Sequence, residues 1–219
     1  MRFIEGGWWV WARARHIPES LVATVLISGV GWAAACGLRS VDGLAQAEGR
    51  APLAFWLPIL MTVAWSSGLV SRTALVDETC ARSSSWLRLC YLGVALMAGV
   101  AGLVAALPAD PGVFGWGAAA RTYVGCLGFA AVVGCWVPAG LLWLAPTTIG
   151  VVWGLASSPF LPTAAQTVLF WPKQPGGVVT ATGQPDLSWA VALILFACGV
   201  AASRRRVNPA VLFTETESA

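Results

Sequence analysis

Long apolar segments separated by short charged ones are the feature that most constrains how this chain folds. Asp, Glu, Lys and Arg make up only 11% of its 219 residues, whereas a typical soluble domain is about 25% charged. A helix needs about 20 mainly apolar residues to cross a bilayer. With 58% hydrophobic residues and a mean hydropathy of +0.74, the composition excludes soluble globular and disordered chains and indicates an integral membrane protein.

Six segments come close to this length, although the first and the last are short, and each is bounded by charged residues or by clusters of proline and glycine. They cover approximately residues 21–38, 52–70, 89–107, 123–144, 147–169 and 187–202. Pro159 and Pro162 interrupt the fifth segment, which predicts a broken, re-entrant element within 159–186, before the last helix. We therefore predict an all-α membrane bundle with three parts, namely an interfacial amphipathic helix at 1–20, a six-span domain at 21–206 and a cytoplasmic tail at 207–219.

The positive charges predict the orientation of this bundle. Nine of the 13 Lys and Arg residues lie before the first segment, between the second and third, or after the sixth. The other four lie in connections on the opposite side. Because positively charged loops stay in the cytoplasm, both termini are predicted to be cytoplasmic.

Residues 33–36 faintly resemble a cleavage or lipidation site, which would make the first apolar segment a signal peptide. Three observations favour a retained span instead. Ala33 stands where a lipidation site has a large aliphatic residue, the leader would be unusually long, and its removal would disturb the charge pattern.

Tryptophan prefers the headgroup level of a bilayer, and most of the 13 tryptophans fall near predicted segment ends. Four lie inside the predicted segments, namely Trp32, Trp65, Trp136 and Trp153. These four either pack helices together or line a path for an apolar or aromatic substrate.

Several kinds of chemistry are disfavoured by what the segments lack. All ten acidic residues fall in connections, edges or tails, and no ionisable residue is expected inside a span, which disfavours a transporter coupled through membrane carboxylates. His16 is the only histidine, so one chain cannot form a multi-histidine metal site or a zinc protease HExxH motif. None of the six cysteines forms a CxxC motif, and the scattered positive charges do not support a nucleic-acid-binding face.

The chain also has no Walker A motif, because its one lysine, Lys173, is followed by Gln174. We expect that the chain is not an enzyme by itself and holds no cofactor. Any ATP-driven transport would rely on a separate ATPase.

The connection at 71–88 carries five charged side chains, more than any other connection between segments, namely Arg72, Asp77, Glu78, Arg82 and Arg88. Residues 74–82 are long enough for two helical turns, with acidic groups near the start and an arginine near the end, as the helix dipole favours. The connection is therefore either a solvated linker or a docking helix for a soluble partner.

Small residues four apart indicate close helix packing, as Gly150 with Gly154 and Ala98 with Gly102. Neutral polar residues such as Ser66 and Ser67 either bond to backbone carbonyls or line a polar path.

In layout the chain resembles a permease subunit of a type 2 ABC exporter. That family has an interfacial N-terminal helix, six spans, a docking loop between spans two and three, and a broken outer segment between spans five and six. The corresponding pieces here are 1–20, the six segments, 71–88 and 159–186. Family members often carry a Glu followed by a Gly-Thr pair in the docking loop, and Asp77, Glu78 and Thr79 match this in part, without the glycine.

The resemblance implies a dimer in the bacterial cytoplasmic membrane, formed by two copies or by this chain and a paralogue. ATP and Mg would be held by a partner ATPase beneath the dimer. An amphipathic or hydrophobic substrate would cross the membrane as the dimer changes from an inward-open to an outward-open state. ATPase docking would then involve Arg72, Asp77, Glu78 and Arg82. The candidates for the translocation path are Trp65, Ser66, Ser67, Trp153 and Ser157.

A second interpretation is a non-catalytic scaffold or assembly subunit, which would bind an integral partner through its Gly- and Ala-rich faces. A third, an intramembrane enzyme acting on lipids, is disfavoured because the predicted segments contain no acid, base or metal ligand.

Overall fold

The computed structural model describes residues 3–39, 51–69, 84–107, 115–155 and 187–205. Within these ranges the regular secondary structure is entirely helical, which confirms the predicted all-α class for this part of the chain. In chain order the helices are α1 (Phe3–Ala14), α2 (Ile17–Arg39), α3 (Ala51–Leu69), α5 (Ser84–Ala106), α6 (Trp116–Val133), the 3₁₀ helix η2 (Ala139–Leu141), α7 (Leu144–Leu155) and α9 (Leu187–Arg205).

Three helices are long and apolar enough to cross a membrane. They lie at Ile17–Gly37, Trp86–Ala106 and Trp116–Val133, with mean hydropathies of 1.7, 2.2 and 1.2. Shorter apolar helices lie at Leu53–Leu69, Ala139–Val152 and Leu187–Ser203. The protein is therefore a membrane-embedded helical protein, and the full count of six spans stays a prediction.

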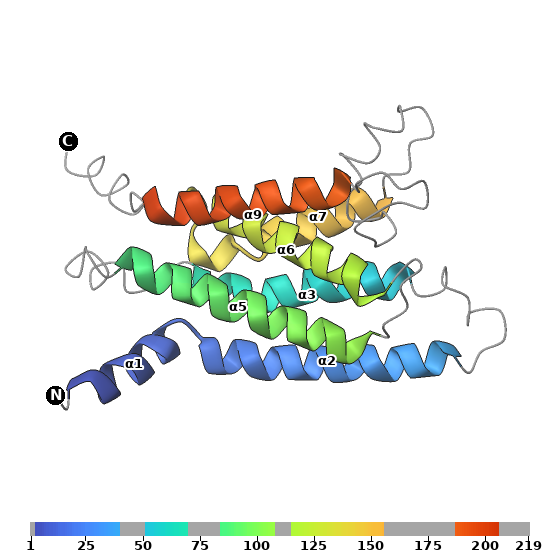
Figure 1. Cartoon of the computed structure of the whole chain (residues 1–219), viewed down its shortest axis with the longest axis horizontal. Helices are drawn as coiled ribbons and strands as arrows, with labels where there is room; N and C mark the ends of the chain where they lie inside the picture. The colour runs from blue at the N-terminus through green and yellow to red at the C-terminus, as the bar shows by residue number, and fades with distance from the viewer. Residues whose placement is uncertain (1–2, 40–50, 70–83, 108–114, 156–186, 206–219) are drawn as a thin grey trace.

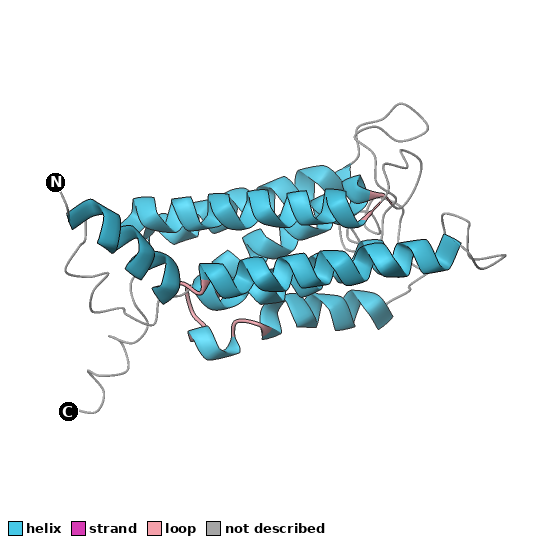
Figure 2. Cartoon of the chain, turned by 90° about the horizontal axis from the view of Figure 1, so that it is seen from below, coloured by secondary structure: helices cyan, strands magenta, loops and turns pink. Residues whose placement is uncertain are grey.

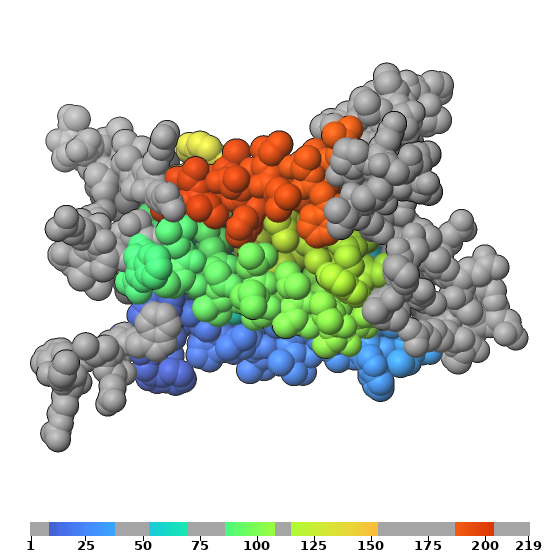
Figure 3. Space-filling model, in the orientation of Figure 1, coloured from blue at the N-terminus to red at the C-terminus, as the bar shows by residue number. Residues whose placement is uncertain are grey.

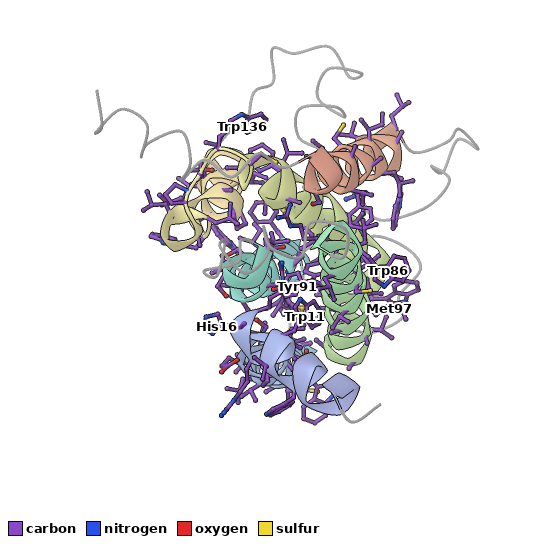
Figure 4. All side chains as sticks on the ribbon, turned by 90° about the vertical axis from the view of Figure 1, so that its left-hand side faces the viewer. Trp11, His16, Trp86, Tyr91, Met97 and Trp136 are labelled. Carbon is purple, nitrogen blue, oxygen red and sulfur yellow. The ribbon has the colours of Figure 1, made fainter. Side chains whose placement is uncertain are left out.

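The long helices lie side by side (Figures 1 and 2). Helices α3 and α6 are interior: α3 packs against α2, α5, α6 and α7, and α6 packs most extensively against α9. Seen along the bundle, α2 lies on one side of this pair, and α7 and α9 lie on the other (Figure 4). One outer face of the molecule is formed by α2, α5 and α9, with α6 visible between α5 and α9 (Figure 3).

Burial explains why α6 is the least apolar of the three long helices. In α6, 72% of the Trp116–Val133 window is buried, compared with 22% of the apolar window in α2. A helix surrounded by protein tolerates polar residues, because neighbouring helices satisfy them, whereas a lipid-facing helix has only hydrocarbon around it.

Successive long helices alternate in direction, so one end of the bundle collects α1, the end of α3, the start of α5 and the end of α9 (Figure 1). We call this the α1 end. The opposite end collects the end of α2 and the starts of α3, α6 and α9.

Glycines allow the helix backbones to approach closely at several crossings. A Cβ atom at Gly199 in α9 would lie 2.6 Å from the Gly128 carbonyl oxygen in α6, and one at Gly128 would overlap the backbone of Phe196. A Cβ at Gly102 would lie 2.6 Å from Ser28 Oγ, and one at Gly150 would lie 2.8 Å from Trp56 Cζ3. Such close contacts suit membrane helices, whose association depends on van der Waals packing.

The predicted fourth segment, 123–144, is wrong at both ends. Helix α6 begins at Trp116 and ends at Val133, and residues 134–143 form turns and η2. Pro138 has an extended conformation, with ψ of 153°, and lies in the connection between α6 and α7. Trp136 lies on this connection with 71% of its surface exposed, not inside a span.

Other boundaries also differ from the sequence prediction. Residues 17–20 belong to α2 and not to the interfacial helix, because Pro18 fits the first turn of a helix, where a backbone N–H is not needed. Helix α5 begins at Ser84, ahead of the predicted start at Leu89, and α7 begins at Leu144, ahead of Thr147. Residues 156–169 of the fifth segment, the predicted re-entrant element at 159–186 and the tail at 207–219 lie outside the described residues.

The variant Gly128→Ala should lower the thermal stability of the protein, because the new methyl group overlaps the backbone of α9 and cannot rotate away. We expect a loss of about 1–3 kcal/mol, the usual cost of overpacking. Gly93→Ala is the matched control, since a Cβ there meets no atom within 4 Å and alanine favours helix. Thermal unfolding in nanodiscs, followed by tryptophan fluorescence, measures both, and equal midpoints for the two variants would contradict the packing described here.

Candidate functional site

A buried arginine connects four helices at the α1 end. Arg15 lies between α1 and α2 and is 2% exposed. Its Nη1 donates a 3.1 Å hydrogen bond to the carbonyl oxygen of Gly68, in the last turn of α3. Its guanidinium carbon lies 5.8 Å from the ring centroids of Trp11 in α1 and Tyr91 in α5. One side chain therefore contacts α1, α3 and α5 from the start of α2.

The backbone at this point turns sharply through His16. Its φ of 54° lies in the left-handed region, which histidine adopts more readily than most residues. The N–H of Ser20 donates a 2.9 Å hydrogen bond to the His16 carbonyl as α2 begins. Ala12 and Ile17 are buried on either side of the turn, so α1 leaves the bundle at a defined angle to α2 (Figure 1).

Two further hydrogen bonds hold the neighbouring helices in register. Ser20 Oγ donates to the Ala64 carbonyl at 2.8 Å, and the Tyr91 hydroxyl donates to the Trp65 carbonyl at 2.6 Å. Gly68 has no room for a side chain, because a Cβ there would overlap the Tyr91 hydroxyl and the Arg15 carbonyl oxygen.

We call this group the Arg15 junction, and its residues are Trp11, Arg15, Ser20, Gly68 and Tyr91. Trp11 and Tyr91 lie close together when the α1 end faces the viewer (Figure 4). The position suits a cation, since carbonyl groups at a helix C-terminus carry partial negative charge. Planar guanidinium groups also stack favourably on aromatic rings.

The predicted path residues in α3 lie inside the bundle. Trp65 is fully buried, and its Nε1 donates a 2.9 Å hydrogen bond to Thr24 Oγ1 in α2. Ser66 is buried and donates to the Val63 carbonyl at 2.7 Å, while Ser67 is half-buried. To line a path, Trp65 and Ser66 would need the surrounding helices to separate.

The remaining predicted site residues are only partly described. Trp153 belongs to α7, but its side chain lies outside the described part of the structure, as does the whole of Ser157. The predicted docking residues also lie outside the described ranges, namely Arg72, Asp77, Glu78 and Arg82. Their connection starts after Leu69 and ends before Ser84, and the helices at both of its ends contribute to the Arg15 junction.

Among the packing candidates, Ala98 is half-buried and packs against the main core. Gly102 and Gly150 lie at the close helix contacts described above. Gly154 belongs to α7, and its surroundings are not described.

A second buried arginine lies near the opposite end of the bundle. Arg121 in α6 is 0% exposed, and its Nη1 donates a 2.8 Å hydrogen bond to Ser188 Oγ in α9. Arg121 is one of the four positive residues predicted to lie in connections on the outer side, so the prediction of no ionisable residue inside a span is wrong for the Trp116–Val133 helix. An arginine is tolerated in a membrane helix when it faces the bundle interior and is hydrogen-bonded, as this one is.

A signal for Arg121 was present in the sequence. Trp116 is an interfacial type of residue, and it is followed by the small residues Gly117–Ala120, which favour close packing against another helix. Starting the fourth segment at Trp116 would have included Arg121.

No three His, Cys, Asp or Glu side chains come together as a possible metal site in the described ranges. No family model, curated protein or solved structure matches the chain. Function is therefore inferred from the geometry of the two buried arginines and of the helices that they connect.

Replacing Arg15 by alanine should destabilise the protein by about 2–4 kcal/mol, because a charged hydrogen bond and two desolvated aromatic contacts are lost together. Arg15→Lys should have an intermediate effect, since it keeps the charge but lacks the planar fork. Arg13→Ala, at an exposed position two residues away, should change stability by less than about 0.5 kcal/mol. Unfolding in mixed micelles distinguishes them, and similar losses for Arg13→Ala and Arg15→Ala would argue against the junction.

The pair of Arg121 and Ser188 should show energetic coupling. In a double-mutant cycle with Arg121→Gln and Ser188→Ala, we expect a coupling free energy of about 1–2 kcal/mol, since the bond is buried and charge-assisted. Unfolding free energies of the wild type, the two single variants and the double variant measure this coupling. Strictly additive effects would mean that the bond contributes nothing to the α6–α9 contact.

Proposed function

We propose that this chain is the transmembrane permease subunit of an ATP-driven exporter, working with a separate cytoplasmic ATPase and a second copy or a paralogue. The observation that carries the proposal is the Arg15 junction. It ties α1 to the end of α3 and the start of α5, the two helices between which the predicted docking connection runs. A partner that pushes on this connection would move α1, α3 and α5 as one unit.

The distribution of charge supports a cytoplasmic position for the α1 end. Among the described residues, five arginines belong to elements at this end, namely Arg13, Arg15, Arg88, Arg204 and Arg205. Arg39 and Arg121 belong to the opposite end. Because positive charge is retained in the cytoplasm, the proposed orientation has α1 and the end of α9 inside the cell.

In the proposed cycle, closure of the ATPase moves α3 relative to α2 and brings Trp65 and Ser66 onto a path for an amphipathic or hydrophobic substrate. Two hydrogen bonds join α2 to α3 in this region, from Trp65 to Thr24 and from Ser20 to Ala64. Their net contribution is about 1–3 kcal/mol together. Nucleotide binding by the ATPase can supply enough free energy to break both hydrogen bonds.

A scaffold or assembly subunit is the second candidate, and one observation favours it. Trp65 and Ser66 are buried and hydrogen-bonded within a single chain. In this alternative the interior keeps its packing, and the outer helix faces bind an integral partner.

Gentle purification from the native membrane tests the proposal. We expect a stoichiometric protein with a Walker motif and vanadate-sensitive ATP hydrolysis in the preparation. The double variant Asp77→Lys, Glu78→Lys should lose this protein, because both acidic side chains of the predicted docking connection become basic. The matched control, Asp42→Lys with Glu48→Lys, makes the same charge change in the predicted outer connection and should retain it. Co-purification of an integral protein without any ATPase would overturn the exporter function and favour the scaffold.

A further inference from the structure

The outward side of α1 places apolar and cationic side chains next to each other. Trp9 and Val10 are 57% and 66% exposed, and Arg13 is exposed, whereas Ala12 and Arg15 are buried against the bundle. The Arg13 guanidinium carbon lies 5.9 Å from the centroid of the Trp9 ring. We propose that this surface of Trp9, Val10 and Arg13, which we call the α1 face, binds the anionic lipid headgroups of the adjacent leaflet.

The side chains suit the boundary between headgroups and acyl chains. Tryptophan is enriched at this level of the bilayer, and valine inserts into the apolar layer below it. Arginine extends its apolar stem along such a surface and presents a planar fork of donors that matches a phosphate group. Trp86, at the start of α5, is 68% exposed and points outward at the same end of the bundle (Figure 4). Helix α5 therefore also contributes an exposed tryptophan at this end of the bundle.

Charge favours anionic over zwitterionic lipid. Among the described residues, the elements of the α1 end carry five arginines and two carboxylates, Glu5 and Glu19. Arg15 is buried, and Arg88 Nη1 donates to the Ser203 carbonyl at 3.5 Å. Arg13 is therefore the exposed arginine that the α1 face itself presents, and it lies in a region of net positive charge.

The Arg15 junction gives the α1 face a fixed orientation. Arg15 and Trp11 hold one side of α1 against the bundle, so the opposite side is presented outward without further ordering. A preorganised surface loses less conformational freedom when it binds. This lipid contact does not depend on the exporter function, and it would serve the scaffold equally well.

Hydrogen–deuterium exchange of the full-length protein in nanodiscs tests the proposal without a label. The probes are nanodiscs of phosphatidylcholine alone and nanodiscs in which part of the lipid is phosphatidylglycerol. We expect amides of residues 9–14 to exchange about threefold to fivefold more slowly with phosphatidylglycerol, the effect of one arginine near an anionic surface. Added salt should reduce the difference, because the contact is exposed.

Arg13→Gln should abolish the lipid-dependent difference while leaving exchange elsewhere unchanged. Arg39→Gln is the matched control, because it removes the same charge from the opposite end of the bundle, and it should keep the difference. Equal exchange in the two lipids, or protection that persists in Arg13→Gln, would overturn the proposal. Protection of the α1 face that appears only when a soluble ATPase is added, independent of lipid, would also overturn it, by assigning the face to a protein partner.

Discussion

Polar groups inside an apolar bundle must find their partners within the protein, and this constraint shapes the whole structure. In the described helices, most of the serine and threonine hydroxyls that form hydrogen bonds donate to a carbonyl one turn earlier in their own helix, as do Thr62 to Pro58 and Ser203 to Gly199. These bonds satisfy the side chain without specifying a neighbour. Hydrogen bonds between helices are fewer, and they determine which helices are neighbours and in what register they pack.

Those crossing bonds converge on α3 and its neighbours. Trp65 reaches Thr24, Ser20 reaches Ala64, and Tyr91 reaches the Trp65 carbonyl, while the Tyr123 hydroxyl connects α6 to the Ala95 carbonyl of α5 at 2.7 Å. Close glycine contacts add to them, because a Cβ at Gly99 would overlap the ring of Tyr123. Glycines and tyrosines therefore act together. The glycine leaves space for the tyrosine ring, and the tyrosine hydroxyl donates a hydrogen bond to the neighbouring helix.

The two buried arginines apply the same rule to charge, at opposite ends of the bundle. Arg15 is satisfied by a helix-terminal carbonyl and two aromatic rings, and Arg121 bonds to the hydroxyl of Ser188 in the neighbouring helix α9. Both are expensive to bury, so both specify which helices must meet. For the proposed function, the difference between the helices that the two arginines join matters more than the cost of burying them. Arg15 joins the N-terminal helix to α3 and α5, the helices on either side of the predicted docking connection, whereas the hydrogen bond from Arg121 to Ser188 joins the interior helix α6 to α9.

Much of the architecture was already determined by the sequence. Low charge and long apolar runs require helices in a membrane, because only helices or closed barrels satisfy the backbone there. The segments 52–70 and 187–202 were located to within a few residues, since charges or proline and glycine bound them clearly. The tertiary structure alone decided what lies inside. Arg121 was misplaced because a local charge looks like a segment end, and Trp65 had two open interpretations because hydropathy does not distinguish a packed side chain from one that lines a path. Burial depends on which helices become neighbours, and that pairing is set by contacts between residues far apart in the chain, such as Arg15 with Gly68 and Gly128 with Gly199.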